Sequence, residues 1–216
     1  MTSADHPPAA STAGAGPARA GRTLDVPLLP GATAPTACPR RHDLQVAGAR
    51  HGWSQDYHAP EFLCEACHSL PDRGGRWALI NPAVSNQVLE DNVTEAWLQL
   101  VVCPPPVPAG VGMIQLRWGT TIYGQIALSL CRIERRGLVL SLEVEPRHRR
   151  RGVGQLLVAA ARTRGAGYDW SSNSIGTDPI VVAFWARIGA PRVPAQPCSH
   201  QAAASVITDH NWDRWW

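Results

Sequence analysis

The sequence predicts a mixed α/β (α+β) fold, with a mostly antiparallel central sheet flanked by helices and a small zinc-stabilised N-terminal module. Segments with strand and helix periodicity alternate in the C-terminal half, which is typical of a sheet covered by helices. Hydrophobic residues make up 44% of the chain and charged residues 17%. A folded core is therefore expected, and disorder of the whole chain is excluded. Three of the six cysteines and four of the eight histidines fall within residues 37–75.

The 216 residues divide into three parts. Residues 1–36 are rich in Ala, Pro, Gly, Ser and Thr without any periodic pattern, so we expect a disordered tail. Residues 37–75 hold the Cys/His cluster but have too few aliphatic side chains to form a core unaided. The turn-forming run Asp72-Arg73-Gly74-Gly75 ends this module. Residues 76–216 carry most of the aliphatic side chains and form the main domain.

Three strands are expected in the main domain, at Met113–Trp118, Thr121–Leu130 and Leu138–Val144, because apolar and β-branched runs there are bounded by turn residues. The run Cys103-Pro104-Pro105-Pro106-Val107-Pro108 is predicted to be a rigid connector.

A helix is predicted from Gly152 to Arg164. Its apolar residues recur at the spacing of one buried helical face: Val153, Leu156, Leu157 and Ala160. A short strand at 168–172 follows. A second helix begins at Pro179, capped by Thr177 or Asp178, and stops at Gly189.

Charge and composition narrow the function classes. The formal net charge is only +3, which is too weak to indicate a nucleic-acid partner. No apolar run is long enough to span a membrane, and the N-terminal residues lack the charged and apolar regions of a secretory signal. We therefore expect a cytoplasmic protein whose cysteines are free thiols or metal ligands.

Two short-spaced pairs predict a structural zinc site. Cys38 and His42 form a Cys-x3-His pair, and Cys64 and Cys67 form a Cys-x2-Cys pair after an intervening loop. Two such pairs are how a closed tetrahedral site is commonly built, and a segment this poor in aliphatic residues needs a cross-link to fold. The alternative is a loose set of reduced cysteines in a mobile segment.

The aromatic and histidine residues of the module leave two interpretations open. Trp53, Tyr57, Phe62 and Leu63 either form a miniature core around the metal or present a recognition surface. His51, His58 and His68 are expected outside the ligand set. No base-reading helix follows the ligands, so a protein-contacting or substrate-positioning role is favoured over nucleic-acid binding.

The junction after the third predicted strand is the most informative segment. It reads Leu142-Glu143-Val144-Glu145-Pro146-Arg147-His148-Arg149-Arg150-Arg151-Gly152-Val153-Gly154. A strand ends and a helix begins within a few residues, with two glycines at the helix start. Free backbone N–H groups and the positive end of the helix dipole make an anion site suited to a pyrophosphate. The simpler alternative is a glycine-rich turn with a solvated arginine run.

This junction resembles the acyl-CoA-binding motif of the GNAT superfamily of N-acetyltransferases, Arg/Gln-x-x-Gly-x-Gly/Ala. The matching residues here are Arg149-Arg150-Arg151-Gly152-Val153-Gly154. The resemblance continues in Phe184-Trp185-Ala186-Arg187-Ile188-Gly189-Ala190, which is similar to the end of the family's next helix. It covers about residues 112–190. It is weak from 76 to 111, where the family has its acceptor-binding helices.

The resemblance implies a GNAT-like fold, acetyl-CoA as cosubstrate and an amine as acceptor, on a small molecule, a peptide or a protein. The amides of Arg151, Gly152, Val153 and Gly154, with Gln155 next along the helix, would hold the pyrophosphate. The backbone of Leu142 and Val144 would pair with the pantetheine arm, and an amide near Val144 would polarise the thioester carbonyl. Two departures are notable: Trp185 stands where the family commonly has a proton-donating Tyr, and Asp178 replaces a common Asn.

The proton-transfer groups are less defined by the sequence. Glu143 and Glu145 flank Val144 and share one strand face, so each is a candidate base, with a solvent-facing carboxylate pair as the alternative. Tyr168 and Tyr123 are candidate acids or packed aromatics.

Other features carry less information. Cys103, Cys131 and Cys198 are expected to be buried hydrophobes or idle thiols. The three Trp at the C-terminus are expected to close the core, although an acceptor cover or an interface would also fit. Oligomeric state is left open. Two alternative functions are a non-catalytic acyl-CoA-binding or adaptor protein and, less favoured, a zinc-ribbon nucleic-acid binder.

Overall fold

A computed structural model gives the structure of the chain and describes residues 28–70 and 74–208. Most of the expected tail, part of the expected boundary at 72–75 and the Trp-rich C-terminus lie outside the described residues. The described end of the expected tail, residues 28–36, contacts the main domain. Leu29 is buried in the main core, and Asn86 Nδ2 donates to the Pro30 carbonyl at 3.3 Å.

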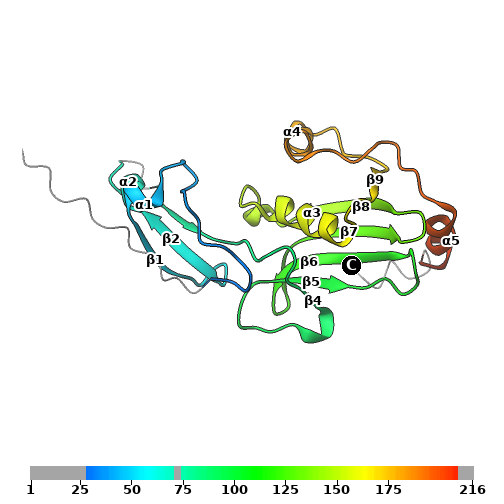
Figure 1. The fold of residues 1–216 in the computed structure, drawn as a ribbon, viewed down its shortest axis with the longest axis horizontal. Helices are drawn as coiled ribbons and strands as arrows, with labels where there is room; N and C mark the ends of the chain where they lie inside the picture. The colour runs from blue at the N-terminus through cyan, green and yellow to red at the C-terminus, as the bar shows by residue number, and fades with distance from the viewer. Residues whose placement is uncertain (1–27, 71–73, 209–216) are drawn as a thin grey trace, which may run out of the picture.

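The N-terminal module is built on a three-stranded antiparallel sheet (Figure 1). The strands are β1 (Ala49–Ser54), β2 (Ala59–Cys64) and β3 (Arg76–Ala78), with short helices α1 (Leu44–Ala47) and α2 (Glu65–His68) beside them. β3 pairs with β2 through Phe62 and Trp77, so this sheet continues past the expected boundary at 75.

The main domain is a six-stranded mixed sheet in the order β4-β5-β6-β7-β8-β9. Its strands are β4 (Gln87–Leu89), β5 (Gln99–Cys103), β6 (Val111–Trp118), β7 (Thr121–Cys131), β8 (Arg136–Val144) and β9 (Asp169–Ser172). The three central pairings are antiparallel, whereas β4 pairs with β5 and β9 with β8 in parallel. This confirms the predicted mixed, mostly antiparallel sheet, and each strand expected between 113 and 172 is present.

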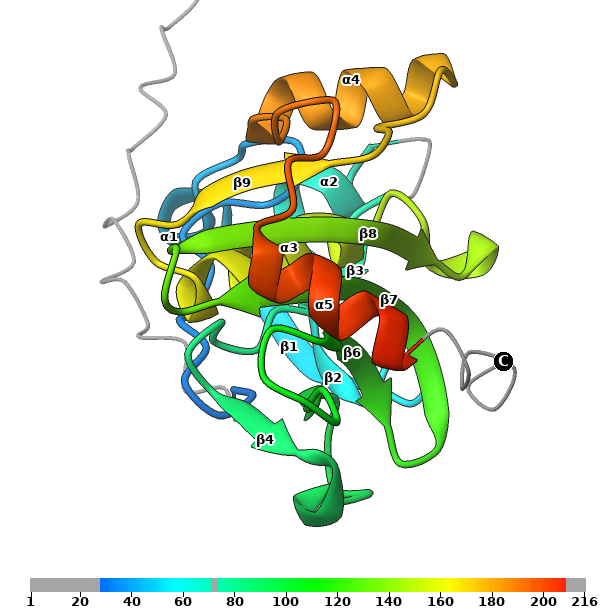
Figure 2. The ribbon, with the colours of Figure 1, turned by 90° about the vertical axis from the view of Figure 1, so that its right-hand side faces the viewer.

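Within residues 74–208, three α-helices accompany this sheet: α3 (Val153–Arg164), α4 (Pro179–Ile188) and α5 (Ser199–Thr208). α3 packs on β6, β7 and β8, and α5 contacts β6 and β7 at the end of the sheet far from the module (Figures 1 and 2). α4 lies beyond β9, above the sheet. Short 3-10 turns occur at Glu90–Asn92 and Pro146–His148.

The core lies between α3 and the sheet. All four apolar residues expected on the buried face of α3 are at most 5% exposed, and they pack with Leu100, Ile114 and Ile126. Gly124 permits this close approach. A Cβ there would lie 2.8 Å from Val153 and 2.9 Å from the Glu143 carbonyl oxygen, closer than packed atoms tolerate.

The segment from 76 to 111 contains β3, β4, a 3-10 turn and β5, and no α-helix. The proline run expected to be a connector joins β5 to β6 directly. The acceptor-binding helices that the resemblance would place before β6 are therefore not formed there. In the part of the chain that the structure describes, no helix is long and apolar enough to cross a membrane.

Candidate functional site

β8 has a free edge over its last residues. β9 pairs only with Arg136–Val139, so Leu140–Val144 has no partner strand on that side among the described residues. The β7–β8 register shifts where Ala127 pairs with Ser141 and Leu128 with Val139, which leaves Leu140 as an extra residue. Such a bulge increases the local twist of a strand. The bulge therefore coincides with the point where β8 and β9 separate.

The free edge exposes particular backbone groups. The Glu145 N–H donates to the Tyr123 carbonyl at 3.1 Å, so the pair Tyr123–Glu145 is hydrogen-bonded. Bonded and non-bonded pairs alternate along an antiparallel ladder. Leu142 and Val144 therefore direct their N–H and C=O groups away from β7, toward the free edge. This is the geometry that an extended amide-bearing ligand needs to bond alongside the strand.

The start of α3 lies directly beyond this edge. Gly152 precedes the helix with φ +88°, is exposed, and would meet no atom within 4 Å if it carried a Cβ. The first helical bond runs from the Leu156 N–H to the Gly152 carbonyl at 2.9 Å. The amides of Val153, Gly154 and Gln155 therefore have no acceptor within the helix, and no side chain caps it. The result is an electropositive, uncapped helix end.

Three consecutive arginines surround this helix end, and all are exposed. Arg149 Nε donates to the Val144 carbonyl at 3.1 Å, which folds the loop back on β8. Arg150 has φ +64°. The Arg151 guanidinium lies 5.3 Å from the centre of the Tyr57 ring, a cation–π contact with the N-terminal module. The loop thus places positive charge beside free amides, as a polyanion requires.

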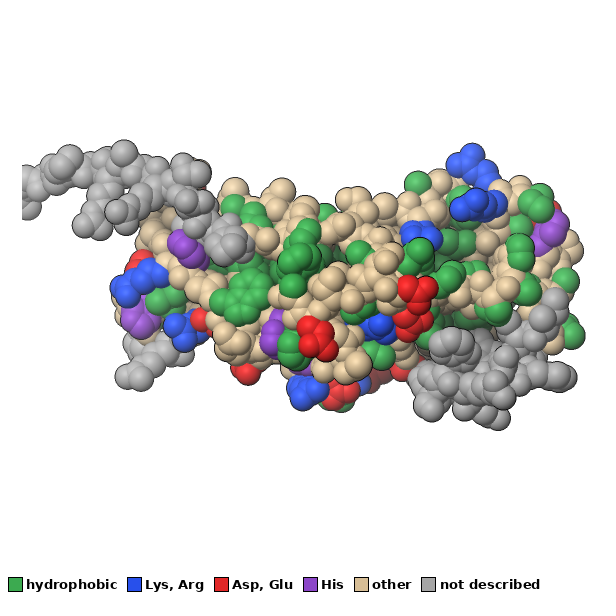
Figure 3. Space-filling model, turned by 90° about the horizontal axis from the view of Figure 1, so that it is seen from below, with side chains coloured by type: hydrophobic (Ala, Val, Ile, Leu, Met, Phe, Trp, Pro, Cys, Tyr) green, Lys and Arg blue, Asp and Glu red, His purple; other side chains and the backbone are tan. Residues whose placement is uncertain are grey.

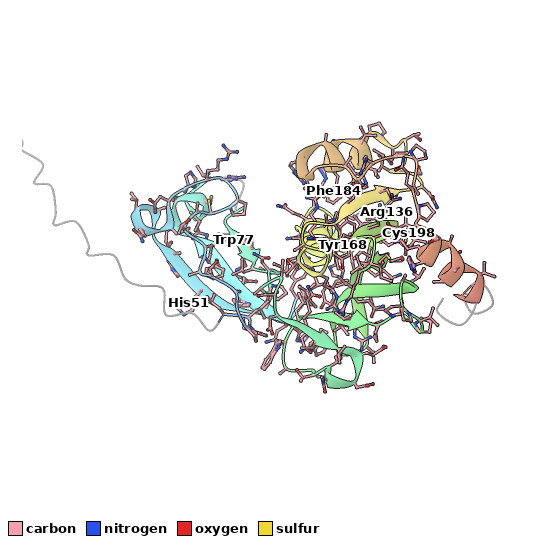
Figure 4. The ribbon with its side chains drawn as sticks, turned by 45° about the vertical axis from the view of Figure 1, so that its right-hand side comes forward. His51, Trp77, Arg136, Tyr168, Phe184 and Cys198 are labelled. Carbon is pink, nitrogen blue, oxygen red and sulfur yellow. The ribbon has the colours of Figure 1, made fainter. Side chains whose placement is uncertain are left out.

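α4 lies on the other side of the space between the free edge of β8 and the start of α3. A Cβ on Gly154 would lie 3.2 Å from the Phe184 ring, so Phe184 faces the start of α3 (Figure 4). Trp185 instead points into the core and is 5% exposed. It lines a small apolar pocket with Ile126, Val139, Val158, Ala161, Arg162, Trp170 and Pro191. Asp178 caps α4, because its Oδ1 accepts the Ile180 N–H at 2.7 Å.

The two candidate carboxylates are both exposed. Val144 lies opposite Gly124, whose Cβ direction points at α3. Glu143 therefore lies on the other face of the sheet, where its Oε2 accepts from Gln125 Nε2 at 3.4 Å. Glu145 precedes the 3-10 turn, and no contact of its carboxylate singles it out as a base.

The structure does not bring the candidate tyrosines to the free edge. Tyr168 precedes Asp169, which pairs with Arg136 at the start of β8 (Figure 4). Val144 is the last residue of that strand, so it lies at the opposite end. Tyr123 is 2% exposed, and its hydroxyl donates to the Asp56 carbonyl at 3.2 Å. Burial raises the pKa of Tyr123 above its usual range. Neither phenol is placed to protonate a thiolate at Val144.

The four predicted metal ligands come together in the module. Cys38 Sγ lies 3.8 Å from Cys67 Sγ, and His42 Nδ1 lies 3.6, 3.7 and 3.2 Å from the sulfurs of Cys38, Cys64 and Cys67. Tetrahedral zinc with ordinary bond lengths requires about 3.8 Å between sulfurs and about 3.6 Å between sulfur and nitrogen. The residues present therefore fit a closed Cys3His zinc site.

The surroundings of this cluster are dry. Cys64 and Cys67 are at most 2% exposed, and Leu44 packs against them. Burial, with the neighbouring thiols Cys38 and Cys64 adding to it, raises the pKa of Cys67 to about 11. Because a metal binds the thiolate, metal binding here is coupled to proton release.

The aromatic residues of the module have separate places. Phe62 is fully buried and stacks on Trp77 with ring centres 5.6 Å apart, whereas Trp53 is 39% exposed. Tyr57 faces the main domain. Its ring centre lies 5.5 Å from that of His148 and 6.4 Å from that of Tyr123. Of the two interpretations left open by the sequence, a miniature core describes Phe62, whereas Trp53 is an exposed surface residue.

The turn between β1 and β2 packs against the arginine loop, which is the segment 147–151 between β8 and α3. Tyr57 makes this contact with Arg151 and His148, and the sequence did not predict it. The next residue of the turn contacts the sheet instead: the His58 ring stacks on Trp118 at the end of β6 with ring centres 3.3 Å apart, and the His58 carbonyl accepts the Leu98 N–H at 3.3 Å. His148 is 6% exposed, and neither ring nitrogen has a hydrogen-bond partner. Burial lowers the pKa of His148, and the charge of Arg147 adds to the effect. No periodicity marks these residues, so only the tertiary contact reveals them.

Comparison with known proteins finds similarity to acetyltransferases. The chain is 32% identical over 117 residues to the mycothiol acetyltransferase of Parafrankia sp. (strain EAN1pec), which covers 54% of this chain and 29% of that protein. The chain thus spans less than a third of that relative's length. No family model matches the chain.

Solved structures give partial superpositions. A nourseothricin acetyltransferase is 27% identical and covers 37% of this chain and 49% of that one, at a TM-score of 0.31. An aminoglycoside acetyltransferase from an uncultured soil metagenomic sample, with trehalose bound, is 16% identical, covers 41% and 62%, and has a TM-score of 0.33. A proposed acetyltransferase from Deinococcus radiodurans R1 is 21% identical, covers 44% of this chain and 64% of that one, and has a TM-score of 0.33. At these scores no shared activity follows.

Proposed function

We propose that this protein transfers an acetyl group from acetyl-CoA to an amine acceptor in the cytoplasm. The observation that carries the proposal is the free edge of β8 at Leu140–Val144, which ends beside the uncapped start of α3. The free edge of β8 offers backbone hydrogen bonds to an extended chain. The start of α3 offers positive charge and free amides to a pyrophosphate. Similarity to an acetyltransferase over 117 residues supports the same assignment.

The start of α3 and the free edge of β8 would each bind a different part of CoA. The amides of Val153, Gly154 and Gln155 would bind the pyrophosphate, with Arg149 and Arg150 adding positive charge. The pantetheine arm would lie along Leu142 and Val144, and Phe184 would enclose it from the side of α4. Gly154 keeps that passage open, because a larger side chain would meet Phe184.

The chemical part is direct transfer. The acceptor nitrogen attacks the thioester carbonyl, a C–N bond forms, the C–S bond breaks, and CoA leaves as the thiolate. An amide at the free edge near Val144 would polarise the carbonyl oxygen. Glu143 or Glu145 would take the proton of the amine. Trp185 is buried and its indole is no acid, so water would protonate the thiolate.

We also propose that zinc is bound by Cys38, His42, Cys64 and Cys67 and has a structural role. A closed four-ligand site leaves no position for substrate. Its effect on function would be to hold the β1–β2 turn, which carries Tyr57 against Arg151 and His148. This gives the module a positioning role. Basic side chains are scattered among acidic, neutral and apolar ones on the face in Figure 3, and the formal net charge is only +3, so this face offers no basic patch for nucleic acid.

A non-catalytic acyl-CoA-binding protein is the second candidate. It is favoured by one observation: among the described residues, neither candidate acid, Tyr123 nor Tyr168, lies at the free edge, and Trp185, which replaces the tyrosine of the family, is buried. Such a protein would bind CoA and acetyl-CoA and release no thiol with any amine.

Calorimetric titration with CoA and acetyl-CoA, followed by a thiol-release assay on a panel of amines, tests both candidates. Gly154→Leu should abolish binding because it meets Phe184. Gly52→Leu, on β1 with open space around it, is the matched control and should bind normally. Binding with thiol release supports the transferase, and binding without release supports the second candidate. Failure of the unmodified protein to bind either nucleotide would overturn both.

A further inference from the structure

A second group of metal-ligating side chains lies at the other end of the main sheet. Cys131 ends β7, and Cys198 and His200 lie at the start of α5. Their two sulfurs and one ring nitrogen are all within 4.8 Å of one another. We propose that Cys131, Cys198 and His200 form a second zinc site, distinct from the one in the N-terminal module.

The positions of the three ligand atoms fit this assignment. Cys131 is 2% exposed and Cys198 is 7% exposed, whereas His200 is exposed to solvent. Cys198 Sγ lies 4.0 Å from His200 Nδ1, and tetrahedral zinc needs about 3.6 Å. A small rotation of the exposed imidazole closes that difference. Two thiolates and one imidazole leave a fourth position, on the solvent side, for water.

The backbone around the site is held in place before any ion binds. Gln201 is 3% exposed, and its Oε1 accepts the Cys198 N–H at 3.1 Å. Its Nε2 donates to the Ser129 carbonyl at 3.2 Å and to the Ser129 hydroxyl at 3.1 Å. Arg136 Nη1 donates to the Gln196 carbonyl at 3.1 Å, and Arg136 and Cys198 are neighbours in Figure 4. α5 therefore starts at a fixed position beside Cys131.

The donor atoms select the ion. Thiolate and imidazole suit zinc, whereas calcium and magnesium require oxygen ligands. The Glu134 N–H donates to Cys131 Sγ at 3.5 Å, which fixes the position of this sulfur. Zinc with two thiolates is electrically neutral, so burying both sulfurs leaves no unpaired charge. The site would join the C-terminal segment to the sheet.

This site is separate from the proposed acyl-CoA site. Cys131 pairs with Arg136 at the start of β8, whereas the free edge lies at the opposite end, near Val144. Loss of the second metal is therefore expected to loosen α5 and to leave CoA binding unchanged. From the sequence, Cys131 and Cys198 were expected to be buried hydrophobes or idle thiols, and 66 residues lie between them in the chain.

Zinc content per chain, measured by inductively coupled plasma mass spectrometry after dialysis, tests the proposal. Cys198→Ser and His200→Ala should each lower the content by about one zinc relative to the unmodified protein. His200 is exposed, so its variant keeps the fold. Cys103→Ala is the matched control and should keep the full content, because Cys103 is buried in β5 outside both clusters. Burial raises the pKa of the Cys103 thiol to about 11, so it remains protonated.

The test compares the zinc content of each variant with that of the unmodified protein. Its outcome therefore does not depend on whether the N-terminal module also binds zinc. If the unmodified protein holds one zinc and Cys198→Ser holds none, the second site stands and the first fails. Unchanged zinc content in both Cys198→Ser and His200→Ala would overturn the proposal. Peptide mapping that finds a Cys131–Cys198 disulfide in freshly purified protein would also overturn it.

Discussion

The N-terminal module and the main domain reach a folded state by different means. The module's buried cluster consists of Cys38, Leu44, Cys64 and Cys67, with four partly buried neighbours. The main domain buries a continuous apolar layer between α3 and the sheet. A small apolar cluster cannot offset the conformational entropy of ordering its chain, so the proposed zinc would supply the remaining free energy. The arginine loop lies where these two regions meet, and each prediction below separates their contributions.

The largest expected effect is the loss of the module. Cys64→Ser should remove one ligand, release zinc and unfold the module, because metal binding and folding are one equilibrium in such sites. Hydrogen exchange followed by mass spectrometry should then show lost protection in β1, β2 and β3 and retained protection in β6 and β7. Cys103→Ala serves as the control. Unchanged protection of β2 in Cys64→Ser would contradict the claim that the module depends on metal.

A substitution in the core of the main domain should lower the stability of that domain and leave the N-terminal module intact. Gly124→Val would force a side chain against Val153 and the Glu143 carbonyl, and overpacking of this kind costs about 1–3 kcal/mol. Urea unfolding followed by tryptophan fluorescence measures the loss, and zinc content should stay constant. Release of zinc from this variant would indicate that the two regions unfold as one unit.

A smaller effect is expected where the regions touch. Tyr57→Ala removes the ring beneath Arg151, a contact worth about 0.5–1 kcal/mol. The affinity of the protein for CoA should therefore fall by about two- to fivefold. Trp53→Ala, an exposed change on β1, should have no effect on CoA affinity. Equal CoA affinity in Tyr57→Ala and the unmodified protein would mean that the module does not position the loop.

The smallest effect is a pH dependence at His148. Burial lowers its pKa in the folded protein, whereas in the unfolded chain a histidine titrates near about 6.5. Below that pH the unfolded state binds the proton more readily, so the free energy of unfolding should fall as pH drops from about 6.5 toward the lower folded pKa. His148→Phe should remove this component. Urea unfolding between pH 7.5 and 5, with His51→Ala as control, measures it, and equal slopes in the two variants would contradict the assignment.

Local patterns determined much of the main domain. The apolar spacing of 153–160 predicted α3, and turn residues bounded the strands that became β6, β7 and β8. The Cys-x3-His and Cys-x2-Cys spacings predicted which four residues meet in the module. The predicted helix and strands are confirmed, because each depends on neighbours within a few residues. The meeting of the two Cys/His pairs joins segments that lie far apart in the chain, so it comes from the tertiary structure. Neither the bound zinc nor the roles of Glu143 and Glu145 follow from those spacings, so both remain proposals.

Contacts between distant segments were decided only by the tertiary structure. The bulge at Leu140 and the early end of β9 create the free edge, and the parallel register of β8 and β9 places Tyr168 at the wrong end of the strand. The docking of Tyr57 on Arg151 and the meeting of Cys131 with Cys198 likewise join residues far apart in sequence. A linear pattern records the period and the caps of one element. It carries no information about which elements pack together, because that choice depends on the summed burial of the whole chain.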